Sequence, residues 1–194
     1  AAEEMRLRMR ALLGSRANGT PLIGTFHSIS ARILREDIGF LGYDSTFTIF
    51  DEDDSKKAIK TVMQEQGISK DMYHPKIFLR LLDRAKREGV SEGGFLERMN
   101  QEIESPLLET ADLLYPAYQA FLKRSNALDF GDLLFKVVIL WRENPTVLEK
   151  YQKRFLHVLV DEYQDTNRIQ YEFCHLLTKE HQNLFVVGDD YQSI

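Results

Sequence analysis

The most constraining feature of the sequence is a pair of short apolar runs, each followed by acidic residues. Residues 155–160 are almost entirely apolar and lead into Asp161-Glu162, and residues 184–187 lead into a second acidic segment. Between the two runs, apolar residues recur at the spacing of an amphipathic helix. Continuous apolar strands joined by a helix are typical of a parallel sheet, whose ligands bind beyond the carboxyl ends of the strands. The pattern therefore predicts two buried parallel strands whose acidic ends face one pocket.

Helical periodicity covers most of the remaining chain. The predicted helices are 1–13, 27–37, 75–89, 91–100, 106–124, 129–142 and 146–154, with a further helix capped by Asp51, and short strands are predicted at 22–24 and 46–50. The predicted fold class is therefore α/β. A partial parallel sheet, formed by the two ends of the chain, encloses a large and mostly helical stretch.

Composition excludes several classes of protein. The chain has 194 residues, a net charge of -5 and a single cysteine. One cysteine excludes an internal disulfide framework and a cysteine-based zinc site, which fits a reducing, cytoplasmic setting. No apolar run approaches the roughly 18 residues that a membrane helix needs, so no membrane partner is expected. The mild acidity argues against a globally basic nucleic-acid binder but leaves room for a local basic groove.

The first acidic strand end has the form of a nucleotide site. Asp161 can hold Mg²⁺, which prefers oxygen ligands and keeps part of its water shell, and Glu162 can polarise an attacking water near a γ-phosphate. An acidic pair alone is a weak signal, because a solvated loop has the same composition. Gln192, after the next strand, favours the nucleotide interpretation. A glutamine there can bond a phosphate oxygen in one nucleotide state and lose that bond after hydrolysis.

These motifs resemble those of a known family. VDEYQDTN at 160–167 and VVGDDYQSI at 186–194 resemble two signature motifs of the UvrD/PcrA/Rep-like DNA helicases, superfamily-one ATPases that move 3′ to 5′ on single strands. Other family segments follow in the same order: AAEEM at 1–5, GTFHS at 24–28, FTIFDEDD at 47–54 and NALDFGDLL at 126–134. The resemblance implies a partial RecA-like parallel sheet of the P-loop NTPase type in 1–26 and 155–194. It implies a large, mostly α-helical insertion subdomain in 27–154.

The resemblance also implies an activity and a set of site residues. The implied protein is an ATP-dependent 3′–5′ DNA helicase that uses ATP and Mg²⁺ and acts on single-stranded DNA and on junctions of single and double strands. Asp161 becomes the Mg²⁺-associated carboxylate, Glu162 the catalytic base and Gln192 the γ-phosphate sensor. Gln164 and Asp165 fall in the same nucleotide-side network. Repair or replication proteins are the implied partners, and the implied location is cytoplasmic.

The chain departs from the family's pattern in two ways. Gly131 and Tyr191 stand where acidic residues are common, at positions that carry no chemistry. No G-x-x-x-x-G-K-[ST] phosphate loop occurs in the sequence. In the family this loop lies upstream of the segment that Ala1 begins, and a second RecA-like domain follows the segment that Ile194 ends. We therefore interpret the chain as a fragment and expect no ATP turnover from it alone.

A first DNA-contacting group is predicted at the start of a helix. The resemblance places Thr25, Phe26 and His27 where the family touches single-stranded DNA. Free N–H groups at a helix N-terminus and nearby polar side chains suit phosphate oxygens. Phe26 can stack on a base or pack in the core, and both roles stay open at this point.

A second DNA-contacting group is predicted on a later helix. Arg80, Arg84 and Arg87 share one helical face at i, i+4, i+7 spacing, as a strip that follows phosphates would. A solvated helix face would carry the same residues, and we weigh the two interpretations equally.

Three other functions remain in view. A helicase–nuclease subunit of the same superfamily would share these motifs, although such subunits carry larger insertions. A metal-dependent nuclease would use Asp161, Glu162 and Asp165, but nothing in the chain resembles lysine-containing nuclease motifs. A non-catalytic DNA- or partner-binding fragment is the third, and nucleotide-independent DNA binding would support it.

Overall fold

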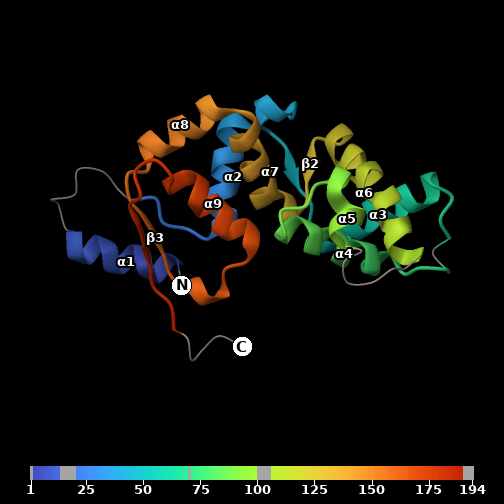
Figure 1. The fold of residues 1–194 in the computed structure, drawn as a ribbon, viewed down its shortest axis with the longest axis horizontal. Coiled ribbons are helices and arrows are strands. Elements are labelled where there is room, and N and C mark those ends of the chain that lie inside the picture. The colour runs from blue at the N-terminus through green and yellow to red at the C-terminus, as the bar shows by residue number, and fades with distance from the viewer. Residues whose placement is uncertain (1, 14–20, 70, 100–105, 190–194) are drawn as a thin grey trace.

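The computed structural model describes residues 2–13, 21–69, 71–99 and 106–189. The described residues form two helical lobes, which lie side by side in Figure 1. The first lobe contains α2 (Phe26–Asp37), the 3-10 helix η2 (Ile38–Leu41), α7 (Phe130–Glu143), α8 (Pro145–Arg154), β3 (Val158–Val160), η4 (Tyr163–Asp165), α9 (Arg168–Thr178) and β4 (Leu184–Val186). The second contains α3 (Glu52–Glu65), α4 (Pro75–Arg87), η3 (Glu92–Gly94), α5 (Phe95–Met99) and α6 (Pro106–Arg124). An N-terminal helix, α1 (Ala2–Leu13), precedes both.

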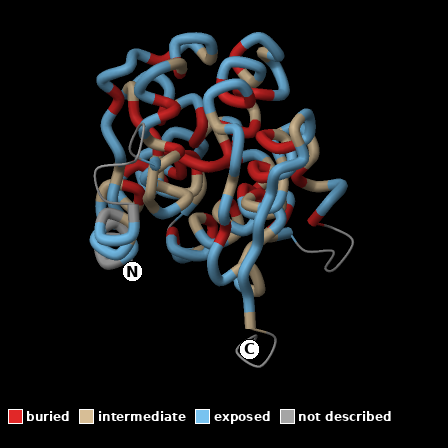
Figure 2. The backbone as a smooth tube through the Cα atoms, turned by 90° about the vertical axis from the view of Figure 1, so that its left-hand side faces the viewer, coloured by how far each residue is buried: buried red, intermediate tan, exposed pale blue. Residues whose placement is uncertain are grey.

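The first lobe is built on the apolar faces of α2, α7, α8 and α9. At its centre, the Trp141 ring lies 4.8 Å from the Phe173 ring and 5.8 Å from the Tyr151 ring. Buried aliphatic residues from all four helices complete this core, and the buried positions lie on the inward faces of the helices (Figure 2). Cys174 is buried in it as a small hydrophobic residue.

The second lobe has a core of its own. Asp51 caps α3 as predicted, because its carboxylate accepts a hydrogen bond from Asp54 N–H at 2.8 Å. The stripe Ala58, Ile59, Val62 and Met63 is fully buried against α4 and α6. The helices predicted from periodicity are thus confirmed in both lobes.

Two short strands connect the lobes. The chain enters the second lobe through β1 (Thr48–Ile49) and leaves it through β2 (Ala127–Leu128), and these strands pair in parallel. The pairing continues at both ends, where Thr48 N–H donates to the Asn126 carbonyl at 3.0 Å and Phe50 N–H donates to the Leu128 carbonyl at 2.8 Å. The entry and exit of the second lobe therefore lie together.

The two cores show which helices pack together, and the boundary expected for an insertion over 27–154 stays a prediction. Residues of α2, α7 and α8 pack with α9 and β3, so they share the core of the acidic strand end. Among the described helices, only α3–α6, between β1 and β2, bury their apolar faces in the second core. Apolar stripes give each helix a buried face but do not specify which partner covers it.

The predicted strand–helix–strand unit is present near the end of the chain. β3 and β4 pair in parallel, with Val158, Leu159 and Val160 opposite Leu184, Phe185 and Val186, and α9 connects them. Asn167 and Gln170 start α9 with a reciprocal capping box.

Two expectations about the sheet are corrected. Residues 21–25 form neither a helix nor a strand, so the strand predicted at 22–24 is not found. The second run is a strand, but it is not buried: Phe185 is 61% exposed, and Leu159 on β3 is 73% exposed. Burial of a parallel strand needs cover on both faces, and the described residues bury Val160 and partly bury Val158 but leave Leu159 exposed.

A buried ion cluster fastens the second lobe to the first. Lys86 of α4 is only 1% exposed, and its Nζ lies 2.6 Å from Asp129 Oδ2 and 2.8 Å from Asp132 Oδ1. The two aspartates also form the capping box of α7. Gln119 of α6 donates to Asp132 Oδ1 at 3.1 Å. One cluster therefore joins α4, α6 and α7.

The charges of the cluster shift the pKa values of its three ionisable members. Burial by itself would lower the pKa of Lys86, but the two carboxylates hold it above its ordinary value. Burial and the Asp132 charge raise the pKa of Asp129. Against the effect of burial, the Lys86 and Lys136 ammonium groups hold the pKa of Asp132 below its ordinary value. Removal of Lys86 would leave both buried carboxylates without their ion-pair partner.

We predict that Lys86→Met lowers the free energy of unfolding by about 3–5 kcal/mol, the usual cost of breaking one side of a buried ion pair. Urea denaturation measures this quantity. Lys57→Met serves as the matched control, because the Lys57 side chain is 78% exposed, and it should change stability by at most about 1 kcal/mol. Equal stability of the two variants would contradict the role of the cluster.

Candidate nucleotide site and nucleic-acid surface

The loops that follow β3 and β4 are hydrogen-bonded to each other. We call residues 161–165 the β3 loop and residues 187–189 the β4 loop. Val187 N–H donates to the Val160 carbonyl at 2.9 Å, and Tyr163 N–H donates to the Val187 carbonyl at 2.9 Å. The pairing of the strands therefore continues into both loops. The expectation that the two segments lie side by side is confirmed for the described residues, and Gln192 lies outside them.

Glu162 has a left-handed backbone at the turn of the β3 loop. Its φ and ψ are 54° and 43°, a conformation that costs a non-glycine residue on the order of 1 kcal/mol or more and is concentrated at functional sites. Its N–H donates to Asp161 Oδ1 at 3.1 Å. Asp161 and Glu162 are both exposed. The turn therefore presents two adjacent carboxylates to solvent at the carboxyl end of β3.

Gln164 connects Glu162 to the β4 loop. Its Nε2 donates to Glu162 Oε2 at 2.7 Å, and its Oε1 accepts from Asp189 N–H at 3.1 Å. Asp165 ends the 3-10 turn with an exposed side chain, and its N–H donates to the Glu162 carbonyl at 3.0 Å. The sequence assigned Gln164 and Asp165 to one network, and of the two only Gln164 bridges the loops.

The exposed carboxylates at the end of β3 suit Mg²⁺ better than they suit a metal ion enclosed by protein ligands. Among the described residues, no group of three or more histidine, cysteine or acidic side chains is placed to hold a metal ion. Mg²⁺ is commonly held by one or two carboxylates, with waters and phosphate oxygens as its other ligands. An exposed Asp161 carboxylate fits such a site.

The predicted DNA-contacting residues at the start of α2 separate into two roles. Thr25 is the N-cap of α2, and its exposed hydroxyl accepts from Ser28 N–H at 3.2 Å. Phe26 is partly buried and packs edge to face on Phe173, with the ring centres 5.9 Å apart. The Phe26 ring therefore packs against the first core, and its contact with DNA stays a prediction.

His27 stacks on a residue that the sequence did not suggest. The His27 and Phe130 rings are nearly parallel, with an interplanar angle of 18° and centres 4.0 Å apart, and Phe130 is 59% exposed. Phe130 stands on the same helical stripe as Leu134 and Trp141, so periodicity assigns it to the core. It is exposed although Asp132 and Leu133 of the same turn are buried, which only tertiary structure reveals.

Burial lowers the pKa of His27 below its ordinary value. The Asp83 carboxylate opposes this shift, and the Arg87 guanidinium adds to it. The imidazole is therefore mainly neutral at pH 7 and offers one N–H donor and one nitrogen acceptor.

The basic strip of α4 approaches the same place. Arg80, Arg84 and Arg87 are all exposed, and Arg87 forms an ion pair with Asp83 at 2.6 Å. Since the charges of Asp83 and Arg87 act on His27, the last turn of α4 lies beside the start of α2. The Arg87 end of the second predicted DNA-contacting group therefore lies near His27 of the first.

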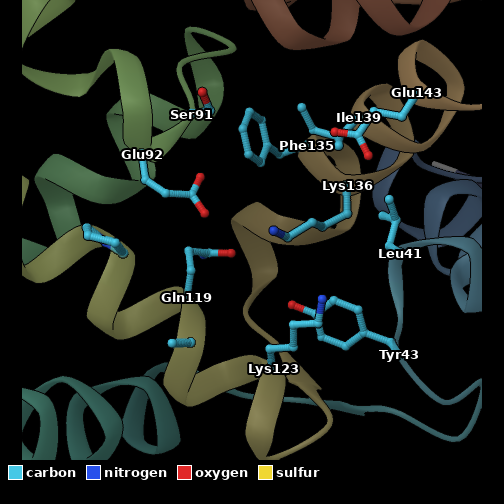
Figure 3. Close-up of a pocket in the computed structure, with 12 residues that line it drawn as sticks. Leu41, Tyr43, Ser91, Glu92, Gln119, Lys123, Phe135, Lys136, Ile139 and Glu143 are labelled. Carbon is cyan, nitrogen blue, oxygen red and sulfur yellow. The ribbon is translucent and has the colours of Figure 1, made fainter.

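A cavity of about 390 Å³ opens elsewhere, between the lobes. It is lined by residues of η2, η3, α6 and α7, and Figure 3 shows Glu92, Gln119 and Lys136 directed into it. None of the predicted site residues lines this cavity.

Every helix in the described part of the chain is too short or too polar to cross a membrane.

Comparisons with known proteins agree with these motifs. Residues 1–194 match the family described as UvrD/REP helicase N-terminal domain. The chain is 38% identical over 194 residues to the protein named ATP-dependent DNA helicase PcrA in Staphylococcus aureus strain Mu50, and equally to the protein of that name in Staphylococcus epidermidis. Each alignment covers 100% of this chain and 26% of the relative. The chain therefore spans about a quarter of the length of these relatives.

We predict that Phe130→Ala raises the pKa of His27 toward its ordinary value of about 6.5, because one face of the imidazole becomes exposed to water. Histidine-labelled protein followed by NMR through a pH titration measures this pKa. Phe185→Ala, which removes an exposed ring on β4, serves as the control and should leave the titration of His27 unchanged. An unchanged His27 titration in Phe130→Ala would contradict burial by Phe130 as the cause of the lowered pKa.

Proposed function

Because the chain belongs to the UvrD/REP helicase family, we propose that it forms part of an ATP-dependent 3′–5′ DNA helicase. The observation that carries this proposal is the pairing of β3 with β4, which brings two acidic loops to one edge of a parallel sheet. Nucleotides bind at this edge in open α/β sheets. In this proposal the first lobe is part of a RecA-like domain.

The nucleotide chemistry is assigned to the β3 loop and to the segment after it. Asp161 would hold Mg²⁺, which when bound neutralises charge on the phosphates of ATP. Glu162 accepts a proton from the water that attacks the γ-phosphate, and its exposure leaves room for that water. Gln192 senses the γ-phosphate from the segment after β4. Asp165 contributes negative charge at the same edge.

The DNA surface is assigned to the start of α2 and the end of α4. The free N–H groups of α2 and the Thr25 hydroxyl are phosphate donors, and the neutral His27 donates a hydrogen bond without carrying a full charge. The exposed face of Phe130 continues the ring stack of His27 and is suited to a base. Arg80, Arg84 and Arg87 extend the surface as a basic strip over the second lobe.

The core of the first lobe supports a coupling between the bound nucleotide and the DNA strand. The β3 loop and the start of α2 pack against one hydrophobic core, since Tyr163 and Phe26 both contact it. We propose residues 27–154 as the insertion subdomain, in which α3–α6 form the separately packed lobe, and a junction of single and double strands as the substrate of the whole protein. Repair or replication partners and a cytoplasmic location are part of the same proposal.

The described residues favour a helicase over a metal-dependent nuclease. A nuclease that used Asp161, Glu162 and Asp165 together would require these carboxylates to converge on a metal ion. The three do not form such a cluster. A helicase–nuclease subunit remains compatible with the proposed site, because its ATPase motor would contain the same residues.

We predict that Glu162→Gln lowers the kcat of ATP hydrolysis by at least about 100-fold in the whole protein, because the amide cannot accept the proton of the attacking water. The binding of ATP should persist, since Asp161 is unchanged. A steady-state ATPase assay with single-stranded DNA measures both parameters. Glu180→Gln, at an exposed turn after α9, should behave as wild type. Full activity of Glu162→Gln would exclude Glu162 as the base.

We predict that replacing Arg80, Arg84 and Arg87 with Ala weakens the binding of single-stranded DNA by the whole protein. The slope of log Kd against log salt concentration should fall by up to about 2, or roughly 0.7 for each lost phosphate contact. Fluorescence anisotropy over a salt series measures the slope. Replacing the exposed Lys57 and Lys60 of α3 controls for general loss of positive charge. An unchanged slope would remove the α4 strip from the DNA path.

A further inference from the structure

The side chain of Gln164 has two hydrogen bonds, and they lead to different loops. Its amide nitrogen donates to the Glu162 carboxylate at 2.7 Å, within the β3 loop. Its carbonyl oxygen accepts from Asp189 N–H at 3.1 Å, in the β4 loop. One amide group therefore spans the distance from the proposed catalytic base to the loop that leads toward Gln192.

Only one orientation of the Gln164 amide satisfies both neighbours. A carboxylate accepts hydrogen bonds and a backbone N–H donates them, so the NH₂ group must face Glu162 and the carbonyl must face Asp189. A flipped amide would oppose oxygen to oxygen and N–H to N–H. A displacement of the β4 loop therefore moves or releases the group that holds the Glu162 carboxylate.

Gly188 keeps the β4 loop close enough for this contact. A Cβ atom on Gly188 would lie 2.7 Å from Gln164 Oε1, closer than such atoms approach in proteins. The next nearest atoms, the backbone nitrogens of Gln164 and Tyr163, would be 3.4 and 3.6 Å away. A methyl group at position 188 would thus displace the Gln164 side chain while the backbone stays in place.

The fold of the β3 loop does not depend on the Gln164 side chain. Backbone hydrogen bonds hold the loop: Tyr163 N–H donates to Val187, Asp165 N–H to Glu162 and Thr166 N–H to Tyr163, each to a carbonyl oxygen. The side-chain bonds of Gln164 are additional to these bonds. Their effect is to fix the direction of the Glu162 carboxylate, whose backbone is already in a left-handed conformation.

We propose that Gln164 is a positioning residue that couples the β4 loop to the Glu162 carboxylate. The proposal rests on the ATPase function proposed above. When the β4 loop is in its paired position, Gln164 holds Glu162 toward the nucleotide. When nucleotide or DNA displaces the β4 loop, Gln164 no longer orients the Glu162 carboxylate. The pair Gln164 and Gly188 thereby makes hydrolysis depend on the position of the segment that leads to Gln192.

The test uses Gln164→Ala, Gly188→Ala and the double variant in the whole protein, with ATP and single-stranded DNA. We expect each single variant to lower the DNA-stimulated kcat about tenfold, as is common when a residue that orients a catalytic group is removed. The KM for ATP should stay within about twofold, because the interaction acts on the base and not on uniform substrate binding. The double variant should be no slower than the slower single variant, since both changes break one contact.

Two further variants separate positioning from a loss of structure. Gln164→Glu keeps the acceptor for Asp189 N–H but opposes an oxygen to the Glu162 carboxylate, so its kcat should fall as well. Gln64→Ala, on the exposed face of α3, controls for a Gln-to-Ala change and should behave as wild type. Thermal unfolding should be unchanged in Gln164→Ala, because the backbone bonds of the loop remain.

The outcomes distinguish the two proposals. A wild-type protein without DNA-stimulated hydrolysis would overturn the ATPase function and the coupling together. Wild-type hydrolysis with unchanged kcat in Gln164→Ala or Gln164→Glu would overturn the coupling alone. A loss of kcat in the double variant equal to the product of the two single losses would also overturn the coupling. It would show that Gln164 and Gly188 act through separate contacts.

Discussion

The parallel pairing of β3 with β4 is the constraint on which the candidate site depends. Three residues on each strand are in register, and two further backbone bonds extend the pairing into the loops. The pairing leaves the β3 loop and the β4 loop at one edge, although α9 separates them in the chain. A one-residue slip would move Gly188 away from Gln164 and reverse the faces of every side chain on the strand. The register thus determines both the carboxylate turn and its link to the β4 loop.

The buried cluster around Lys86 has a corresponding role for the nucleic-acid surface. It ties the end of α4 to the start of α7, and Phe130 follows directly on the capping residue Asp129. The same joint therefore places the basic strip of α4 near the ring stack of His27. Gly131 fits this close approach, because a Cβ there would lie 3.0 Å from Asp83 Oδ1. The family's common acidic residue at this position would bring a further negative charge beside Asp83.

Periodicity predicted the helices because an amphipathic stripe is a local property of the sequence. It did not predict which helices share a core, since that depends on partners far along the chain. The strand expected at 22–24 and the burial expected for β4 were wrong for the same reason: strands need neighbours and cover. In the site, the positions of Asp161 and Glu162 followed from the motif. The exposure of Phe130 and the bridge made by Gln164 required the tertiary structure.

The distribution of charge separates residues that stabilise the fold from those available for chemistry. Asp129 and Asp132 are paired with Lys86, and Asp37 accepts from Lys150, so these carboxylates have a structural role. Asp161 and Glu162 have no cationic side chain within ion-pair distance in the described part of the chain. Two adjacent carboxylates without a counter-charge repel each other, and an isolated turn would gain from neutralisation by a cation. Their arrangement provides negative charge where the proposed hydrated divalent ion and its nucleotide would need it.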